Sequence, residues 1–212
     1  MNFPVFLAMM IVFVLFLAYK RRKQTQNQEE TNEAFLDRER RANMTRKKDI
    51  SALDYLDYST DGLPLDEYAD EQLLSYETIL KNLCGKRIIN LSGYSNTDLK
   101  LMYGPANLNT LSEYDENYRI LSDTLFAYAE RESELGRETA SIAVLEYAAK
   151  LHIDSSRIYL MLAKLYQKQN TPEKTASLIE LLSSMDKDFA SFTIRRLNSL
   201  SDSSVLPEDL VR

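Results

Sequence analysis

The chain has 212 residues, and its 26 Lys and Arg against 32 Asp and Glu give a net charge of -6. Five Gly and five Pro are too few for the turns of an all-β protein and favour long helices. A single Cys excludes an internal disulfide and a cysteine metal pair, and the acidic body disfavours a nucleic-acid partner because it repels phosphate.

The N-terminal segment is strongly apolar. From Phe3 to Tyr19 it has seventeen uncharged residues, eleven of them Leu, Ile, Val or Phe. At about 1.5 Å per residue, a helix over this run spans roughly 26 Å, the short end of what crosses a bilayer. A cleaved signal peptide would need a positive region before the run and a small-residue site after it, and neither is present. We therefore predict a transmembrane anchor over residues 1–20.

Basic residues follow the apolar run directly, as Lys20, Arg21, Arg22 and Lys23. Such a flank stays on the cytosolic side of the membrane. The sequence therefore predicts a single-pass membrane protein with a cytoplasmic C-terminal domain, which meets membrane lipids through its N-terminal helix.

Residues 21–48 are predicted to be a basic, charged stalk. Together with Lys20 they hold ten Lys and Arg against five Asp and Glu, which leaves sixteen against twenty-seven, or -11, for residues 49–212. One interpretation is a solvated spacer, because so charged a segment buries little apolar surface. The alternative is contact with anionic lipid head groups, at about 1 kcal/mol per basic residue near the surface. The two roles are compatible.

Residues 49–109 are predicted to form the N-terminal helices of the body. We expect a short helix within Asp49 to Leu65 and a second helix from Asp70 to Leu91, whose helical spacing is interrupted by Gly85. The pattern from Ser95 to Asp98 is a capping box that opens a third helix, and Gly104 with Pro105 closes it.

The densest polar motif of the body runs from Ser92 to Leu108. It includes Asn96, Asp98, Lys100 and Asn107, which could form a functional site. The interpretation we favour is structural, because these residues already have roles as caps or turn formers.

Residues 110–200 are predicted to form helical hairpins with a C-terminal capping helix, followed by a flexible tail over 201–212. A second capping-box pattern, Thr110 to Glu113, predicts the start of a long helix that ends at Gly136. Its apolar stripe has helical spacing and consists of Tyr114, Tyr118, Leu121, Leu125 and Tyr128. A partner helix over residues 139–151 completes an antiparallel hairpin.

The next hairpin repeats this layout after 34 residues. The shift superposes five positions: Leu125 on Tyr159, Ala129 on Ala163, Gly136 on Asn170, Leu145 on Ile179, and Ala148 on Leu182. The period and the residue classes resemble the tetratricopeptide repeat over roughly residues 122 to 187, although Trp is absent and Glu132 stands opposite Tyr166. The fold class is thus predicted to be all-α, with an N-terminal transmembrane helix followed by an antiparallel helix-hairpin array.

The resemblance implies a concave groove lined by the first helix of each pair. Its positions are Asp123, Phe126, Glu130 and Ser133 in one unit and Arg157, Leu160, Lys164 and Lys168 in the next. Spacings of seven and four put Arg157, Lys164 and Lys168 on one helix face, where they could hold an acidic peptide or a terminal carboxylate. A simple solvated face is the alternative.

No residue pattern of an enzyme stands out. Cys84 and the single His152 are an improbable catalytic pair, Gly85-Lys86 is no phosphate loop, and the Asp residues near Asp54 lack the spacing of a calcium loop. We therefore predict no catalysis, cofactor, metal or small-molecule substrate. The expected function is a membrane-anchored cytosolic scaffold or adaptor that binds other proteins or peptides. The alternative is a structural subunit of a larger membrane protein assembly.

Overall fold

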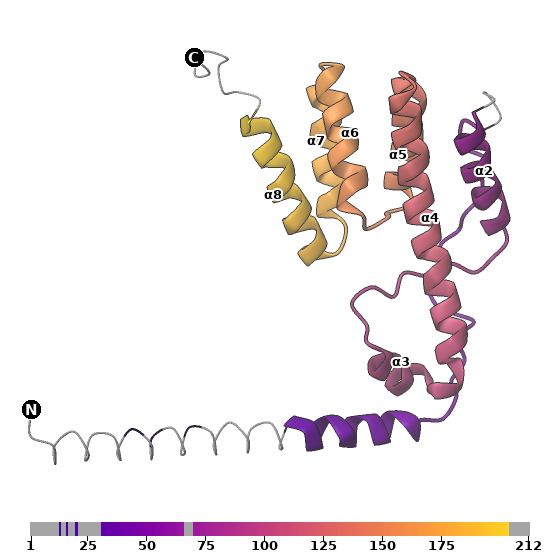
Figure 1. The fold of residues 1–212 in the computed structure, drawn as a ribbon, viewed down its shortest axis with the longest axis vertical. Coiled ribbons are helices and arrows are strands. Elements are labelled where there is room, and N and C mark those ends of the chain that lie inside the picture. The colour runs from indigo at the N-terminus through magenta and orange to yellow at the C-terminus, as the bar shows by residue number, and fades with distance from the viewer. Residues whose placement is uncertain (1–12, 14–15, 17–19, 21–30, 66–69, 204–212) are drawn as a thin grey trace, which may run out of the picture. The chain divides into compact units, whose positions relative to one another are not determined.

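The structure, a computed structural model, describes residues 13, 16, 20, 31–65 and 70–203 (Figure 1). These residues form helices and irregular connections without a strand, which confirms the all-α class. Two compact units are present. Unit 1 combines Met1–Leu53 with Leu91–Leu111, and unit 2 combines Asp54–Asn90 with Ser112–Arg212.

Within the described residues, no helix has both the length and the apolar character needed to cross a bilayer. The predicted anchor over Phe3 to Tyr19 lies outside the described residues except for Phe13 and Phe16, which are exposed. Lys20 is helical and exposed, whereas Arg21 to Lys23 lie outside the description.

Unit 1 contains a helix over residues 31–43, helix α3 (Asn96–Tyr103), the short 3-10 helix η1 (Pro105–Asn107) and the start of α4 (Leu108–Glu134). The capping box at the start of α3 is confirmed: the Asp98 amide donates to Ser95 Oγ and the Ser95 amide donates to the Asp98 carboxylate. The capping box predicted at Thr110 is wrong, because η1 leads directly into α4 at Leu108.

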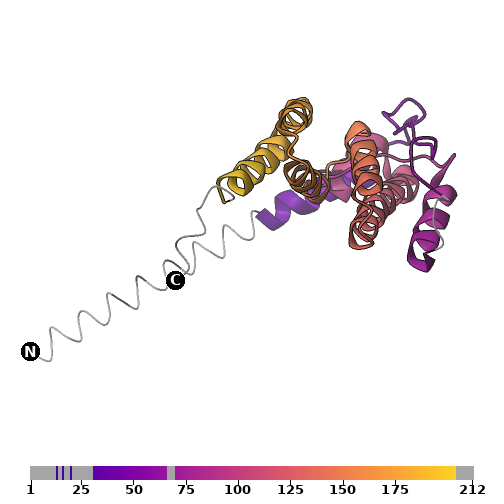
Figure 2. The ribbon, with the colours of Figure 1, turned by 90° about the horizontal axis from the view of Figure 1, so that it is seen from above.

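Unit 2 contains α2 (Glu71–Leu83), the rest of α4, α5 (Glu138–Lys150), α6 (Ser156–Lys168), α7 (Pro172–Ser183) and α8 (Lys187–Ser203). Figures 1 and 2 show α6, α7 and α8 side by side, and these three helices contact one another in every pairing. The predicted apolar stripe of α4 is confirmed, because Tyr118, Leu121, Leu125 and Tyr128 are buried in the core.

Two of the other predicted helices need correction. The helix expected within Asp49 to Leu65 is wrong: the segment is irregular, and the Leu56 amide donates to the Ile88 carbonyl instead of to its own turn. The helix expected to reach Leu91 ends at Leu83, because Gly85 takes a positive φ of 75° that breaks the helix.

The 34-residue spacing is visible in the backbone. Helices α5 and α7 begin 34 residues apart, and each hairpin corner has a residue with positive φ, Gly136 at 76° and Asn170 at 54°. The same hydrogen bond closes both corners: the Arg137 amide donates to the Glu132 carbonyl (2.9 Å), and the Thr171 amide donates to the Tyr166 carbonyl (3.0 Å). The packed helices are therefore compatible with a helical repeat.

Asp70 fixes the start of α2 and makes part of the stability of unit 2 depend on pH. Its carboxylate accepts hydrogen bonds from the Arg131 guanidinium (2.8 Å) and from the Leu73 amide (3.1 Å), and the Arg131 contact is the main reason that its pKa falls to about 2. Because this value lies below the unfolded pKa of about 3.9, the stabilisation is complete above about pH 4 and is lost as the pH falls toward 2.

Replacing Asp70 with Asn keeps an N-cap but removes the charge. We expect D70N to melt below the wild type at neutral pH and the gap to close near pH 2, as measured by circular dichroism. E180Q, at an exposed position in the later part of α7, is the control and should show no such pH-dependent gap. A D70N deficit that is the same at every pH would contradict this account.

Candidate functional site

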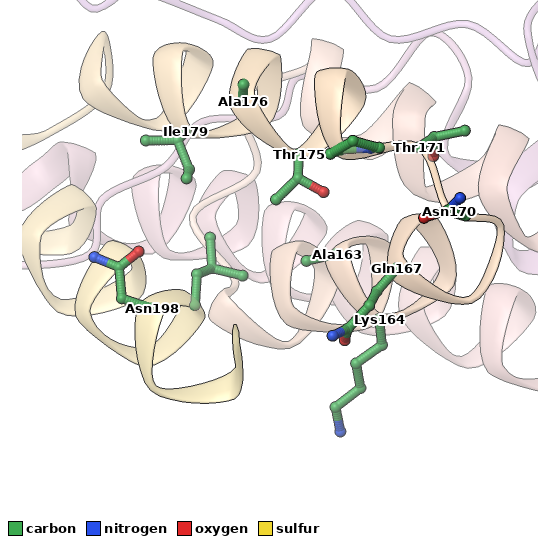
Figure 3. A pocket seen from close by; sticks show the side chains of 11 residues that line it. Ala163, Lys164, Gln167, Asn170, Thr171, Thr175, Ala176, Ile179 and Asn198 are labelled. Atoms are coloured by element: carbon green, nitrogen blue, oxygen red, sulfur yellow. The ribbon is translucent and has the colours of Figure 1, made fainter. Parts of the chain in front are cut away.

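Helices α6, α7 and α8 of unit 2 line a groove of about 380 Å³ (Figure 3). This size lies within the range of small ligand sites. We define the α6–α8 groove as the space lined by Ala163, Lys164, Gln167, Asn170, Thr171, Pro172, Thr175, Ala176, Ile179, Leu197 and Asn198.

The α6–α8 groove combines an apolar wall with polar side chains. Ala163 and Leu197 are buried, and Ile179 is half-buried, so aliphatic surface lies close to the opening. Thr175 and Ile179 project from α7 toward the other two helices in Figure 3. Polar side chains come from α6 and α8 as well, so the groove can bind an apolar group and a hydrogen-bonding group at once.

Lys164 brings positive charge to this groove. It is exposed on α6, and among the described residues no carboxylate forms an ion pair with it. Figure 3 shows its side chain extending away from the α6 ribbon. An unpaired ammonium at the edge of a partly aliphatic groove fits a ligand that carries both a carboxylate and an apolar side chain.

The structure brings three of the predicted groove positions together elsewhere on α4 and α6. Arg157 Nη2 donates to Asp123 Oδ1 at 2.5 Å, and the guanidinium lies 4.7 Å from the centre of the Phe126 ring. These contacts join the first helices of the two hairpins. The charge of Arg157 is therefore already engaged by its own chain.

The remaining predicted positions have other surroundings, as far as their ion pairs and exposure show. Lys168 forms an ion pair with Glu138 of α5. Glu130 is exposed, and Ser133 and Leu160 are half-buried. Of the three predicted cations, Lys164 is thus the one that lines the groove.

The groove residues of α7 and α8 were not predicted from the sequence. A further shift of 34 residues would have pointed to α8, because it carries Lys164 onto Asn198, which lines the groove. Thr175 and Ile179 were not assigned to the groove, because the resemblance places the groove on the first helix of each pair and they lie on the second.

The polar motif of Ser92 to Leu108 is largely structural. Asp98 forms an ion pair with Arg38, and hydrogen bonds from Ser95 are the main cause of its lowered pKa. Lys100 pairs with Glu39 at 3.0 Å. The side-chain amide of Asn107 donates to the backbone carbonyls of Lys48 and Tyr103, each at 2.7 Å. Asn96 is exposed.

His152 lies at a second cavity of unit 2, of about 510 Å³, together with Asp54 and Tyr118. The Tyr118 hydroxyl donates to Asp154 at 2.5 Å, and burial together with this contact raises the pKa of Tyr118. Cys84 does not line the cavity. In the part of the chain that the structure describes, His, Cys, Asp and Glu form no group suited to a metal ion.

Comparison with known proteins does not assign this chain to a family. No protein-family model matches the chain, and no curated protein or solved structure is significantly similar to it.

Proposed function

We propose that this chain is a membrane-anchored scaffold or adaptor whose helical repeat, of tetratricopeptide type, binds a segment of another protein in the α6–α8 groove. The observation that carries the proposal is Lys164, an unpaired cation among the described residues at the edge of a partly apolar groove. The 34-residue spacing of helices and corner hydrogen bonds supports a repeat architecture, which commonly presents binding surfaces of this kind.

The ligand that this chemistry favours is a peptide with a carboxylate beside an aliphatic side chain. The Lys164 ammonium would bind the carboxylate, and Gln167 and Asn198, which line the same groove, would add polar contacts along the peptide. The aliphatic side chain would cover Ala163, Ile179 and Leu197. Such a pairing gives specificity because a charged and an apolar contact must be made together.

The membrane part of the proposal depends on the uncharged run from Phe3 to Tyr19 and the basic residues that follow it. With this orientation the repeat lies in the cytoplasm, tethered to the membrane by one helix. The adaptor would recruit a soluble partner to that membrane.

The test uses the full chain in detergent and a library of short peptides in which acidic and aliphatic residues are varied, with binding followed by fluorescence anisotropy. We expect selected peptides to pair an acidic with an aliphatic residue. K164E should weaken their binding about tenfold or more, because a charge-assisted contact becomes a repulsion.

The matched control is K86E, which reverses an exposed lysine of unit 2 outside the groove. It should leave affinity unchanged. Peptides that bind K164E as tightly as the wild type, or a library from which nothing binds, would contradict the proposal. A chain that is isolated only in one stable membrane complex, resistant to moderate salt, would instead favour the structural-subunit alternative.

A further inference from the structure

Unit 1 exposes large apolar side chains among its cations. Phe35 is 56% exposed, Leu36 is 52% exposed and Met44 is 83% exposed. We call residues 35–48 the basic segment. Its exposed basic residues lie between and after these apolar ones and are Arg38, Arg40, Arg41, Arg46, Lys47 and Lys48. Neighbouring exposed apolar residues of this size often mark an interaction site.

The backbone of the basic segment is fixed within unit 1. Ala42 is fully buried, and Glu39, on the same helix face, accepts hydrogen bonds from Thr97 and Lys100 of α3. Further along, the Lys48 amide donates to the Tyr103 carbonyl at 3.0 Å, and Asn107 donates to the Lys48 carbonyl at 2.7 Å. The segment is therefore held at both ends and is not a free spacer.

Because Glu39 holds the helix against α3 and Ala42 is buried, other side chains of the basic segment face the solvent. Leu36 lies on a helix face different from that of Glu39 and Ala42, next to Arg40, which forms an exposed ion pair with Asp37 at 3.1 Å. Among the described residues, Arg46, Lys47 and Lys48 have no ion-pair partner. Three successive like charges on a fixed backbone favour an anionic partner, which would relieve their repulsion.

We infer that the basic segment binds an anionic membrane surface, with Arg46 to Lys48 at the lipid phosphates and with Leu36 and Met44 in the interfacial region. Two observations favour a bilayer over another polyanion. Exposed apolar side chains gain from entering a lipid interface but not from lying against a phosphodiester backbone. The second observation is the position of the segment in the chain.

Only residues 21–30 separate Lys20, at the end of the proposed anchor, from the helix over 31–43. Ten residues span at most about 35 Å, so the anchor would hold the segment at a high local concentration near the lipid. In this respect the inference rests on the proposed membrane anchor. It adds to the proposed function a second contact, which would hold unit 1 against the bilayer.

The experiment reconstitutes the full chain into vesicles of phosphatidylcholine alone or with phosphatidylserine added. An environment-sensitive dye is attached at Met44→Cys in a Cys84→Ser background, where it labels one position. We expect a blue shift and quenching by lipid-borne quenchers in the anionic vesicles, both reduced by salt, and little of either in the neutral vesicles.

Charge reversal tests the contribution of the basic segment separately from that of the rest of the chain. The triple variant R46E, K47E and K48E should lower the ratio of membrane-bound to free segment by at least about a hundredfold. The matched triple variant K86E, K150E and K187E changes exposed lysines of unit 2 by the same charge and should not. L36S keeps the charge and should reduce the blue shift, which guards against misfolding of the triple variant.

Flotation with neutral vesicles tests the anchor separately. A chain that fails to float with neutral vesicles refutes the anchor. If that chain still floats with anionic vesicles, and the triple variant R46E, K47E and K48E does not, the inference stands without the anchor. A chain that floats while its dye stays in water in anionic vesicles overturns the inference. Dye burial by an added RNA or acidic polypeptide, without burial by lipid, also overturns it.

Discussion

Arg137→Ala should lower the free energy of unfolding by about 3 to 5 kcal/mol, one of the largest effects of any single substitution in unit 2. Arg137 Nε donates to Glu132 Oε2 at 2.5 Å, and Glu132 is only 1% exposed. Removing the guanidinium leaves a buried carboxylate with its charge uncompensated, a much larger penalty than the loss of an exposed pair. Urea unfolding followed by circular dichroism measures the change.

The control is Arg119→Ala, which breaks the ion pair between the exposed Arg119 guanidinium and Asp115, whose side chain is 16% exposed, and should cost about 1 kcal/mol. Adding Glu132→Leu to Arg137→Ala should recover most of the lost stability, because no charge then remains buried. The explanation fails if Arg137→Ala costs no more than Arg119→Ala, or if the double variant is less stable than Arg137→Ala alone.

Gly104→Ala should unfold much of unit 1, with a cost of about 3 kcal/mol or more from backbone strain and steric overlap. Gly104 has a φ of 87°, and a Cβ added there would lie 2.6 Å from the Arg46 carbonyl oxygen and 2.9 Å from Lys47 Cα. Both are backbone positions that cannot move without separating the basic segment from α3. Hydrogen exchange at the Lys48 amide, which donates to Tyr103, reports this separation.

Gly93→Ala provides the matched comparison. Gly93 has a φ of 92°, but a Cβ there would have nothing within 4 Å, so only the conformational cost of about 1 to 2 kcal/mol remains. The difference between the two variants isolates the steric overlap. Equal protection of the Lys48 amide in both variants would show that the close approach at Gly104 is unimportant.

The hairpins of unit 2 could be predicted from the sequence because their signals are local. The stripe from Tyr118 to Tyr128 has helical spacing, and the corner residues Gly136 and Asn170 are types that accept positive φ. Each signal lies within a few residues of the element that it specifies. The same holds for the capping box at Ser95.

The helix wrongly predicted within Asp49 to Leu65 and the packing of unit 1 concern segments whose partners are distant in the chain. The Leu56 amide donates a hydrogen bond to the Ile88 carbonyl, and Lys100 donates one to Glu39. Neither pairing produces a periodic pattern in the sequence. Within Asp49 to Leu65, the tertiary hydrogen bond of Leu56 takes the place of the predicted helical one. For the groove, helical spacing found Lys164 but could not show that Arg157 and Lys168 are paired with carboxylates.

The two hairpin corners have a consequence for how such an array could grow. Because Gly136 and Asn170 close their turns with equivalent hydrogen bonds, residues 137–170 form a block whose two ends have the same local geometry. A tandem copy of that block could be joined at either corner without a new kind of turn. Lengthening the protein by duplication of this block would require adaptation of side chains at one helix interface and no change in backbone design.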